Sequence, residues 1–293
     1  MNQIIFNEKT DYTASTFAEK LKNAVSGDVD SVNFIFGHTP SLDTLQLIDN
    51  LLQKHETPPR VMLTFNGESA LNIADFSELQ SVTYINIQNR YISSLDGVQL
   101  FPILNHVSIT YVLEKELDFT PLVQCKSLKC LDVERRLTKK QHQAISKLPK
   151  LEKLKAHGLN ISQLDIMPYL SFLEVHGLLN PMEFAEKLPC LKDLFILSSN
   201  SLKDLGFLSD MAKLEKLRII KMSGIREFPS FKENNILTDV YLRDMGNLCE
   251  IDNLKTLPQL KKLRLEGNIN LAQEDLAWFS KKEFPCLEKL EFN

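Results

Sequence analysis

The sequence of 293 residues predicts an α/β solenoid, with a parallel β-sheet on one side and short helices or irregular segments on the other. Three observations predict this fold class. An apolar pattern, L-x-x-L-x-L, recurs in one frame along most of the chain. Successive copies begin about 23 residues apart, a period typical of repeat architectures. In five copies a Leu-Pro or Phe-Pro pair ends two residues before the first apolar position.

The copies are clearest in the second half of the chain. Residues 151–156 read LEKLKA and residues 260–265 read LKKLRL. The pattern begins, in order, at residues 29, 58, 82, 104, 128, 151, 170, 191, 214, 237, 260 and 287, and the first two copies are weaker. One such pattern would be a weak signal, but ten convincing copies in register strongly favour a repeat protein.

Within each copy, the alternation of apolar and polar positions predicts a short strand with two side chains facing inward. The remaining apolar positions are expected to fill the interior between successive turns. Because no repeat can bury its apolar face alone, neighbouring copies must stack into one continuous core.

The N-terminal region is expected to begin the stack. We expect residues 1–28 to form a cap that covers the edge of the sheet, with a strand at 4–6 and a helix at 14–25. Residues 41–54 have apolar side chains at helical spacing, which predicts a full helix in the first repeat.

Three later return segments also have helical patterns. They are residues 138–148, 181–188 and 271–282. In the second of these, Asn180 is a candidate N-cap, and Pro181 suits the first helical position because its missing N–H has no helical partner there.

The L-x-x-L-x-L copies resemble the leucine-rich-repeat family, in irregular repeats of bacterial type. The resemblance covers the chain from about residue 29 to its end, and it implies a horseshoe or arc with a concave parallel sheet. It implies a single domain overall, with a cap at 1–28 and about twelve repeats at 29–293. The family's ninth position, usually Asn or Cys, is Asn only at Asn66 and Asn268. We therefore expect an interrupted Asn ladder and irregular curvature.

The third, fifth and seventh positions of each repeat are expected to point outward from the sheet. The third positions would form one column, which begins Ser31, Arg60, Tyr84. In known family members the concave surface commonly binds proteins, and aromatic and arginine side chains around an apolar centre are typical of binding hot spots. The alternative is that these side chains pack as cross-strand pairs for stability. The candidate partner-binding residues are Phe172, Phe195, Leu197, Arg218, Ile220, Tyr241 and Arg243, with His157, His176, Glu134 and Asp132.

Two histidines suggest a competing hypothesis, an enzyme. His157 and His176 share a column in adjacent repeats, and Glu134 is expected beside them. Imidazoles and carboxylates at strand spacing could bind a metal or transfer protons. A third firm ligand is missing, and an open sheet does not exclude water, so a solvated polar ladder is favoured. A pH-dependent contact is a further alternative, because histidine titrates near neutrality.

Composition and motifs exclude several classes. The formal charge of −4 argues against a general nucleic-acid binder. No stretch is long and apolar enough for a membrane span. The N-terminus lacks the pattern of a secretory signal, and the odd number of cysteines, five, favours reduced thiols. No phosphate-binding loop or nucleophile elbow is present.

These observations predict a cytoplasmic, non-catalytic scaffold that binds another protein through its concave face. It needs no cofactor and binds neither nucleic acid nor membrane. Binding itself would then be the activity, as in an inhibitor or an immunity protein.

Overall fold

The computed structural model describes residues 2–6, 19, 22, 31–54, 60–66, 71–233, 235–271 and 284–292. It divides into two compact units, Met1–Leu151 and Glu152–Asn293, called unit 1 and unit 2 below. Both are built from short parallel strands that pair in the order of the sequence.

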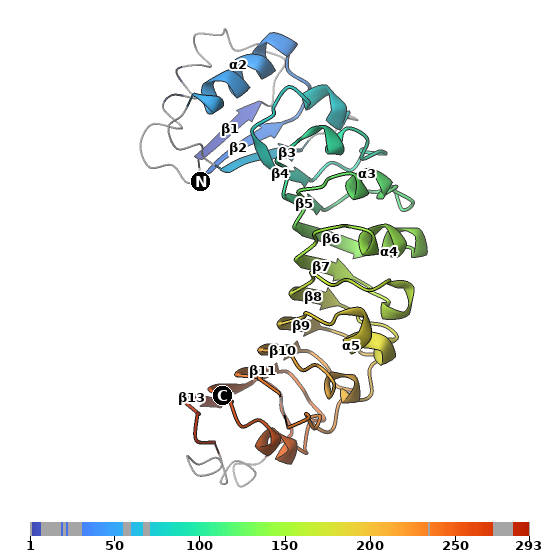
Figure 1. Cartoon of the computed structure of the whole chain (residues 1–293), viewed down its shortest axis with the longest axis vertical. Coiled ribbons are helices and arrows are strands. Elements are labelled where there is room, and N and C mark those ends of the chain that lie inside the picture. Colours follow the sequence, from blue (N-terminus) through green and yellow to red (C-terminus); the bar gives the residue numbers. More distant parts are fainter. Residues whose placement is uncertain are drawn as a thin grey trace. The chain divides into compact units, whose positions relative to one another are not determined.

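In unit 1 each strand is followed by a return segment that leads to the next strand (Figure 1). Its strands are β1 (Asn2–Phe6), β2 (Ser31–Phe36), β3 (Arg60–Phe65), β4 (Val82–Ile87), β5 (His106–Ile109) and β6 (Cys130–Arg136). Its helices are α2 (Leu42–Gln53), α3 (Thr120–Val123) and α4 (Lys139–Ser146), with 3₁₀ helices η1 (Ile73–Phe76) and η2 (Val98–Leu100).

Unit 2 has the same organisation. Its strands are β7 (Lys153–His157), β8 (Phe172–His176), β9 (Asp193–Leu197), β10 (Lys216–Ile220), β11 (Asp239–Arg243), β12 (Lys262–Glu266) and β13 (Lys289–Phe292). Its helical turns are η3 (Ile161–Gln163), η4 (Pro181–Glu183), α5 (Phe184–Lys187), η5 (Gly206–Leu208) and η6 (Asp252–Thr256). In Figure 1 these turns lie on one side of the strands, and no described helix covers the other side, which we call the open face.

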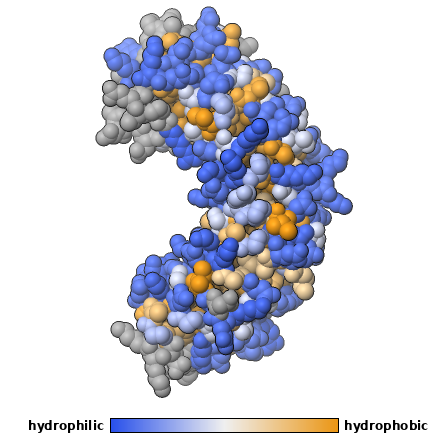
Figure 2. Space-filling model, viewed as in Figure 1, coloured by the Kyte–Doolittle hydropathy of each residue, from blue (hydrophilic) through white to orange (hydrophobic). Residues whose placement is uncertain are grey.

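Alternation along each strand decides which side chains form the core. In β8, Leu173 and Val175 are fully buried, whereas Phe172, Glu174 and His176 on the open face are half-buried. Burying one large aliphatic side chain contributes roughly 1.5–3 kcal/mol, so the stacked leucines of successive repeats hold each unit together. The predicted strands and the inward leucines are therefore confirmed. The surface seen in Figure 2 is mainly hydrophilic, with hydrophobic side chains in small groups.

The residue that follows each unit 2 strand from β7 to β12 adopts a left-handed backbone conformation, which the sequence did not predict. These residues are Gly158, Gly177, Ser198, Lys221, Asp244 and Gly267, with φ between 53° and 75°. This conformation turns the chain out of the sheet. From β7 to β11 the next residue, the ninth of the repeat, is buried, whereas Asn268 after β12 is exposed.

After β7 to β11, buried apolar side chains occupy four of the five ninth positions, in place of the family's asparagine. Leu159, Leu178, Met222 and Met245 are all fully buried. Ser199 is the polar exception, and its hydroxyl oxygen accepts a hydrogen bond of 2.8 Å from the backbone N–H of Leu178. From β7 to β11 the expected interruption of the Asn ladder is thus an apolar ladder with one hydroxyl.

Two predicted helices are confirmed. Helix α2 begins after Ser41, whose hydroxyl accepts from the backbone N–H of Thr44. Helix α4 begins after Thr138, which forms a capping box with Gln141. Such caps satisfy backbone N–H groups that have no partner inside the helix.

The prediction for residues 181–188 was wrong in one respect, the N-cap. Pro181 does begin a helical turn, but Asn180 has a left-handed backbone and makes no capping bond. Its side-chain amide instead donates to Asn160 Oδ1 of the preceding repeat at 3.1 Å, so its side chain links two repeats. The predicted helices at 14–25 and 271–282 lie outside the described residues, and the boundaries of the cap and of the single repeat domain stay a prediction.

The predicted outward column is wrong at its start. Strand β4 pairs Tyr84 with Met62, not with Arg60, and the register shifts by one residue between Val61, which pairs with Val82, and Met62. The first two repeats are therefore displaced by two residues from the predicted alignment. Their small outward side chains are also buried: the Thr64 hydroxyl donates to Asn33 Oδ1 at 2.9 Å, and both residues are buried.

Candidate functional site

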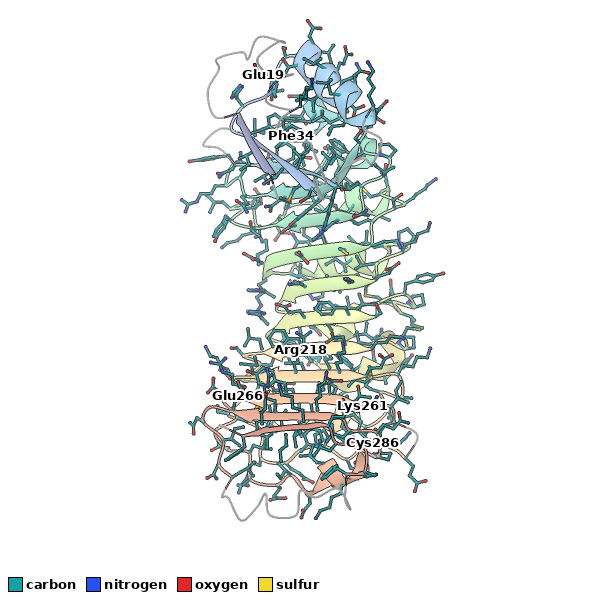
Figure 3. All side chains as sticks on the ribbon, turned by 90° about the vertical axis from the view of Figure 1, so that its left-hand side faces the viewer. Glu19, Phe34, Arg218, Lys261, Glu266 and Cys286 are labelled. Carbon is teal, nitrogen blue, oxygen red and sulfur yellow. The ribbon has the colours of Figure 1, made fainter. Side chains whose placement is uncertain are left out.

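The centre of the open face of unit 2 is a row of alternating aromatic and arginine side chains. Strand register places Phe195, Arg218, Tyr241 and Arg264 beside one another on β9, β10, β11 and β12. Neighbouring strands lie about 4.8 Å apart, so these four side chains form one continuous row. Figure 3 looks onto these strands, with Arg218 labelled and with Lys261 and Glu266 near the two ends of β12.

Arg218 is held by three partners, two on β9 and one on β8. Its Nη2 lies 2.8 Å from Asp193 Oδ1. Its guanidinium carbon lies 5.0 Å from the ring centre of Phe195 and 5.8 Å from that of Phe172. Each cation–π contact is worth about 0.5–1 kcal/mol at a partly exposed site, so Arg218 fixes both rings as well as its own position.

Tyr241 and Arg264 form a second anchored pair. The phenol O–H of Tyr241 donates to Glu266 Oε2 at 2.7 Å, and the Arg264 guanidinium carbon lies 5.2 Å from the ring centre. Arg264 also pairs with Glu266 and with Glu291. Burial raises the pKa of Tyr241, and the hydrogen bond to Glu266 raises it further. The phenol is therefore held in its neutral, hydrogen-bond-donating form.

Strands β9 to β13 enclose a hollow of about 430 Å³ on this face. Its floor includes backbone around Leu217, Val240 and Leu263, and Arg218, Tyr241 and Arg264 line it. Its other charged lining residues are Asp193, Lys216, Asp239, Lys262, Lys289 and Glu291. The hollow therefore combines one anchored aromatic ring with eight charged side chains, which suits recognition of a charged group.

The remaining candidate residues extend the row along the ends of the strands. Leu197, Ile220 and Arg243 are paired in register on β9, β10 and β11. Leu197 and Ile220 are half-exposed, and Arg243 is exposed, with its Nε 3.5 Å from Asp244 Oδ2. All seven candidate residues from Phe172 to Arg243 therefore lie on one face of unit 2, as the sequence predicted.

The two predicted histidines lie together on the same face. The rings of His157 and His176 are stacked, with centres 4.3 Å apart and planes within 8°. His176 Nε2 lies 3.9 Å from Glu174 Oε1, and Glu174 Oε2 is paired with Lys155 at 3.2 Å. Glu134 belongs to unit 1. Across the part of the chain that the structure describes, no group of three His, Cys, Asp or Glu side chains could hold a metal ion.

Asp132 takes part in a network in unit 1 that the sequence did not predict. His106 Nε2 lies 2.9 Å from Asp132 Oδ2, and His106 Nδ1 lies 3.1 Å from Arg60 Nη2. Because arginine can only donate, Nδ1 accepts and Nε2 carries the proton that is donated to Asp132. The imidazole also stacks on Tyr84, with ring centres 3.9 Å apart. Asp132 is half-buried, whereas Glu134 on the same strand is exposed.

The comparisons with known proteins address the fold. No protein-family model matches the chain, and no curated protein matches it. Among solved structures, Toll in the Drosophila Toll–Spatzle complex matches over 99% of this chain and 43% of its own, with 15% identity and a TM-score of 0.58. The chain has the leucine-rich-repeat fold. A Leptospira interrogans LRR protein is matched over 98% of this chain and 100% of its own, at 14% identity and a TM-score of 0.35.

The leucine-rich-repeat fold is shared with longer proteins. The TLR13–ssRNA13 complex matches over 91% of this chain and 47% of its own, with 14% identity and a TM-score of 0.46. The chain thus spans about half the length of the TLR13 and Toll chains that it matches. Among the described helices of this leucine-rich-repeat chain, none has the length and apolar character needed to cross a membrane.

Proposed function

We propose that this leucine-rich-repeat chain is a non-catalytic scaffold that binds another protein through the open face of unit 2. The observation that carries the proposal is the anchored row of Phe195, Arg218, Tyr241 and Arg264 on adjacent strands. Aromatic and arginine side chains dominate the binding energy of protein interfaces, because they bury large areas and pair with polar groups at the same time.

The mechanism is recognition by a preformed surface. Arg218 and Arg264 are already held by carboxylates and aromatic rings. Binding therefore orders few side chains, and each side chain that need not be ordered saves about 0.5–1.5 kcal/mol. Among the matched structures, Toll was solved in a complex with Spatzle, which is compatible with a protein partner here.

The finer role in this proposal is inhibition or neutralisation of the partner, in the manner of an immunity protein, in the cytoplasm. All five cysteines are thiols outside any disulfide, which suits a reducing compartment. A gene for a toxin or an enzyme next to the gene for this chain, with loss of that protein's activity on mixing, would support the role. Unchanged activity of a bound partner would exclude inhibition while leaving binding intact.

Affinity capture with matched variants tests the binding proposal. The full chain is immobilised, and captured proteins are identified by mass spectrometry. Phe172→Ala and Tyr241→Ala should each weaken capture by about 2 kcal/mol or more, the scale of interface hot spots. Tyr169→Ala is the control, because Tyr169 is 61% exposed but lies in the segment before β8.

The outcome is decisive in either direction. Capture that is lost in both open-face variants and kept in Tyr169→Ala supports the proposal. Capture that is equal in all three variants would refute it. A His157→Ala/His176→Ala double variant, with metal analysis of the wild type, tests the enzyme alternative, which requires bound metal or a catalytic loss without a loss of binding.

A further inference from the structure

The hollow on β9 to β13 has an excess of positive charge. Five cationic side chains line it: Lys216, Arg218, Lys262, Arg264 and Lys289. Three carboxylates line it with them: Asp193, Asp239 and Glu291. The lining therefore carries two positive charges more than negative ones, although the whole chain has a formal charge of −4.

The carboxylates of the hollow are already paired. Asp193 pairs with Arg218, Asp239 lies 3.8 Å from Lys262, and Glu291 pairs with both Arg264 and Lys289. The pKa of Glu291 is held below its usual value by hydrogen bonds from Lys289 and Arg264. All three carboxylates are therefore committed to the cations beside them.

Lys216 is the cation of this lining that forms no ion pair with a described carboxylate. Its register neighbours are Asp193 and Asp239, which are engaged by Arg218 and Lys262. Within the described residues no ion pair holds Lys216, and its side chain is exposed at the rim of the hollow. An anionic group from outside the chain would complete this charge pattern.

We propose that the hollow binds an acidic segment of the partner protein. One carboxylate of that segment would pair with the ammonium of Lys216, and another would lie near Lys262 and Lys289. This inference rests on the proposed function and names the chemistry of the partner. Lys216 and Lys262 are two strands apart, about 10 Å. Acidic residues three apart in a polyproline II segment lie on one face at about the same spacing, because that helix has three residues per turn.

The aromatic rings argue against a nucleic acid in the same place. A base would need a free aromatic face on which to stack. Arg218 already lies over Phe172 and Phe195, and Arg264 lies over Tyr241. A continuous phosphate backbone would also meet the carboxylates that alternate with the lysines along the wall, whereas single carboxylates of a peptide can meet single lysines.

A peptide-binding experiment tests the inference. The probe is a fluorescein-labelled hexaglutamate peptide, and fluorescence anisotropy is measured with the full chain at low ionic strength. Hexaglutamate should bind and hexaglutamine should not, and added salt should weaken binding because it screens exposed charges. Equal binding of the two peptides would overturn the inference, as would tighter binding of an oligouridylate RNA of similar length.

Charge variants locate the site. Lys216→Glu should weaken hexaglutamate binding by about tenfold or more, since an attraction becomes a repulsion. Lys216→Gln, which removes the charge without reversing it, should have a smaller effect. Lys203→Glu is the control, because Lys203 is an exposed lysine of unit 2 between β9 and η5 and does not line the hollow. Circular dichroism establishes that each variant is folded.

Equal losses in Lys216→Glu and Lys203→Glu would refute a specific site and indicate only a general charge effect. The two proposals fail separately. If hexaglutamate does not bind but Phe172→Ala still abolishes capture of the partner, the acidic-segment inference is wrong and the binding face stands. If Phe172→Ala and Tyr241→Ala leave capture unchanged, the proposed function itself is wrong.

Discussion

The left-handed residue after β10 offers a sharp test of how these repeats turn. Lys221 has φ of 58°, a conformation that costs an L-amino acid about 1–2 kcal/mol. Its side chain is exposed and makes no ion pair with any described residue. Its backbone N–H donates to the carbonyl of Arg243 at 2.9 Å. Substitution by glycine keeps this hydrogen bond and removes the strain.

The expected magnitude is a difference of two terms. Glycine releases about 1–2 kcal/mol of backbone strain, but its freer unfolded chain costs about 0.5–1 kcal/mol. Lys221→Gly should therefore raise the free energy of unfolding by about 0.5–1 kcal/mol. Gly177→Ala is the reverse change: φ is 75°, and an added Cβ would lie 3.9 Å from Gly158, so strain alone should destabilise by a similar amount.

Equilibrium urea unfolding followed by circular dichroism measures both changes. Lys221→Ala is the matched control, because it removes the same side chain but keeps a Cβ in the left-handed conformation, and it should leave stability unchanged. Repeat proteins can unfold in stages, so the comparison is made on the transition that the variants shift. A Lys221→Gly variant no more stable than Lys221→Ala would refute the account of strain at this position.

Three further predictions concern single groups. The ultraviolet titration of Tyr241, read as the difference between wild type and Tyr241→Phe, should have its midpoint above 10, and Glu266→Gln should lower that midpoint. Because the folded-state pKa is raised, its contribution to stability is present below pH 10 and is lost as pH rises through the raised pKa. A midpoint at or below 10 would contradict the prediction. Burial raises the pKa of Cys125 to about 12. A thiol reagent at mildly alkaline pH should therefore label exposed Cys286 first and Cys125 only on unfolding. Early labelling of Cys125, detected by mass spectrometry, would disprove its burial. Leu242→Ala should destabilise the protein by about 2–5 kcal/mol, because Leu242 is fully buried, and a urea midpoint equal to that of wild type would show that its site is not tightly packed.

The sequence could predict the strands and the open face, because both follow from local alternation. In a strand, neighbouring side chains point to opposite faces, so the leucines at positions four and six identify the inward face without any knowledge of the rest of the fold. Once repeats pair in register, residues such as Phe195 and Tyr241 must share the outward face. This reasoning was sound in unit 2, where the strands from β7 to β12 are regular.

Other features depend on contacts between repeats, which a local pattern does not contain. The shift at Met62 depends on how β3 meets β4, and the role of Asn180 depends on Asn160 in the preceding repeat. The His106–Asp132 bond joins the third position of one strand to the fifth position of the next. A comparison of columns, which pairs equal positions only, could not find that diagonal contact.

The partners of the two arginines explain how an open sheet can present aromatic rings. Exposed aromatic patches invite aggregation, but a guanidinium over each ring leaves one polar surface toward water. Asp193 and Glu291 neutralise Arg218 and Arg264 from the side, so the arginines keep their positions over Phe195 and Tyr241 before any partner arrives. Because the planar guanidinium loses little freedom when it is already held, a partner meets a rigid surface with its charges fixed. In the proposed recognition, Lys216, which has no such carboxylate, provides the charge that distinguishes an acidic partner from a neutral one.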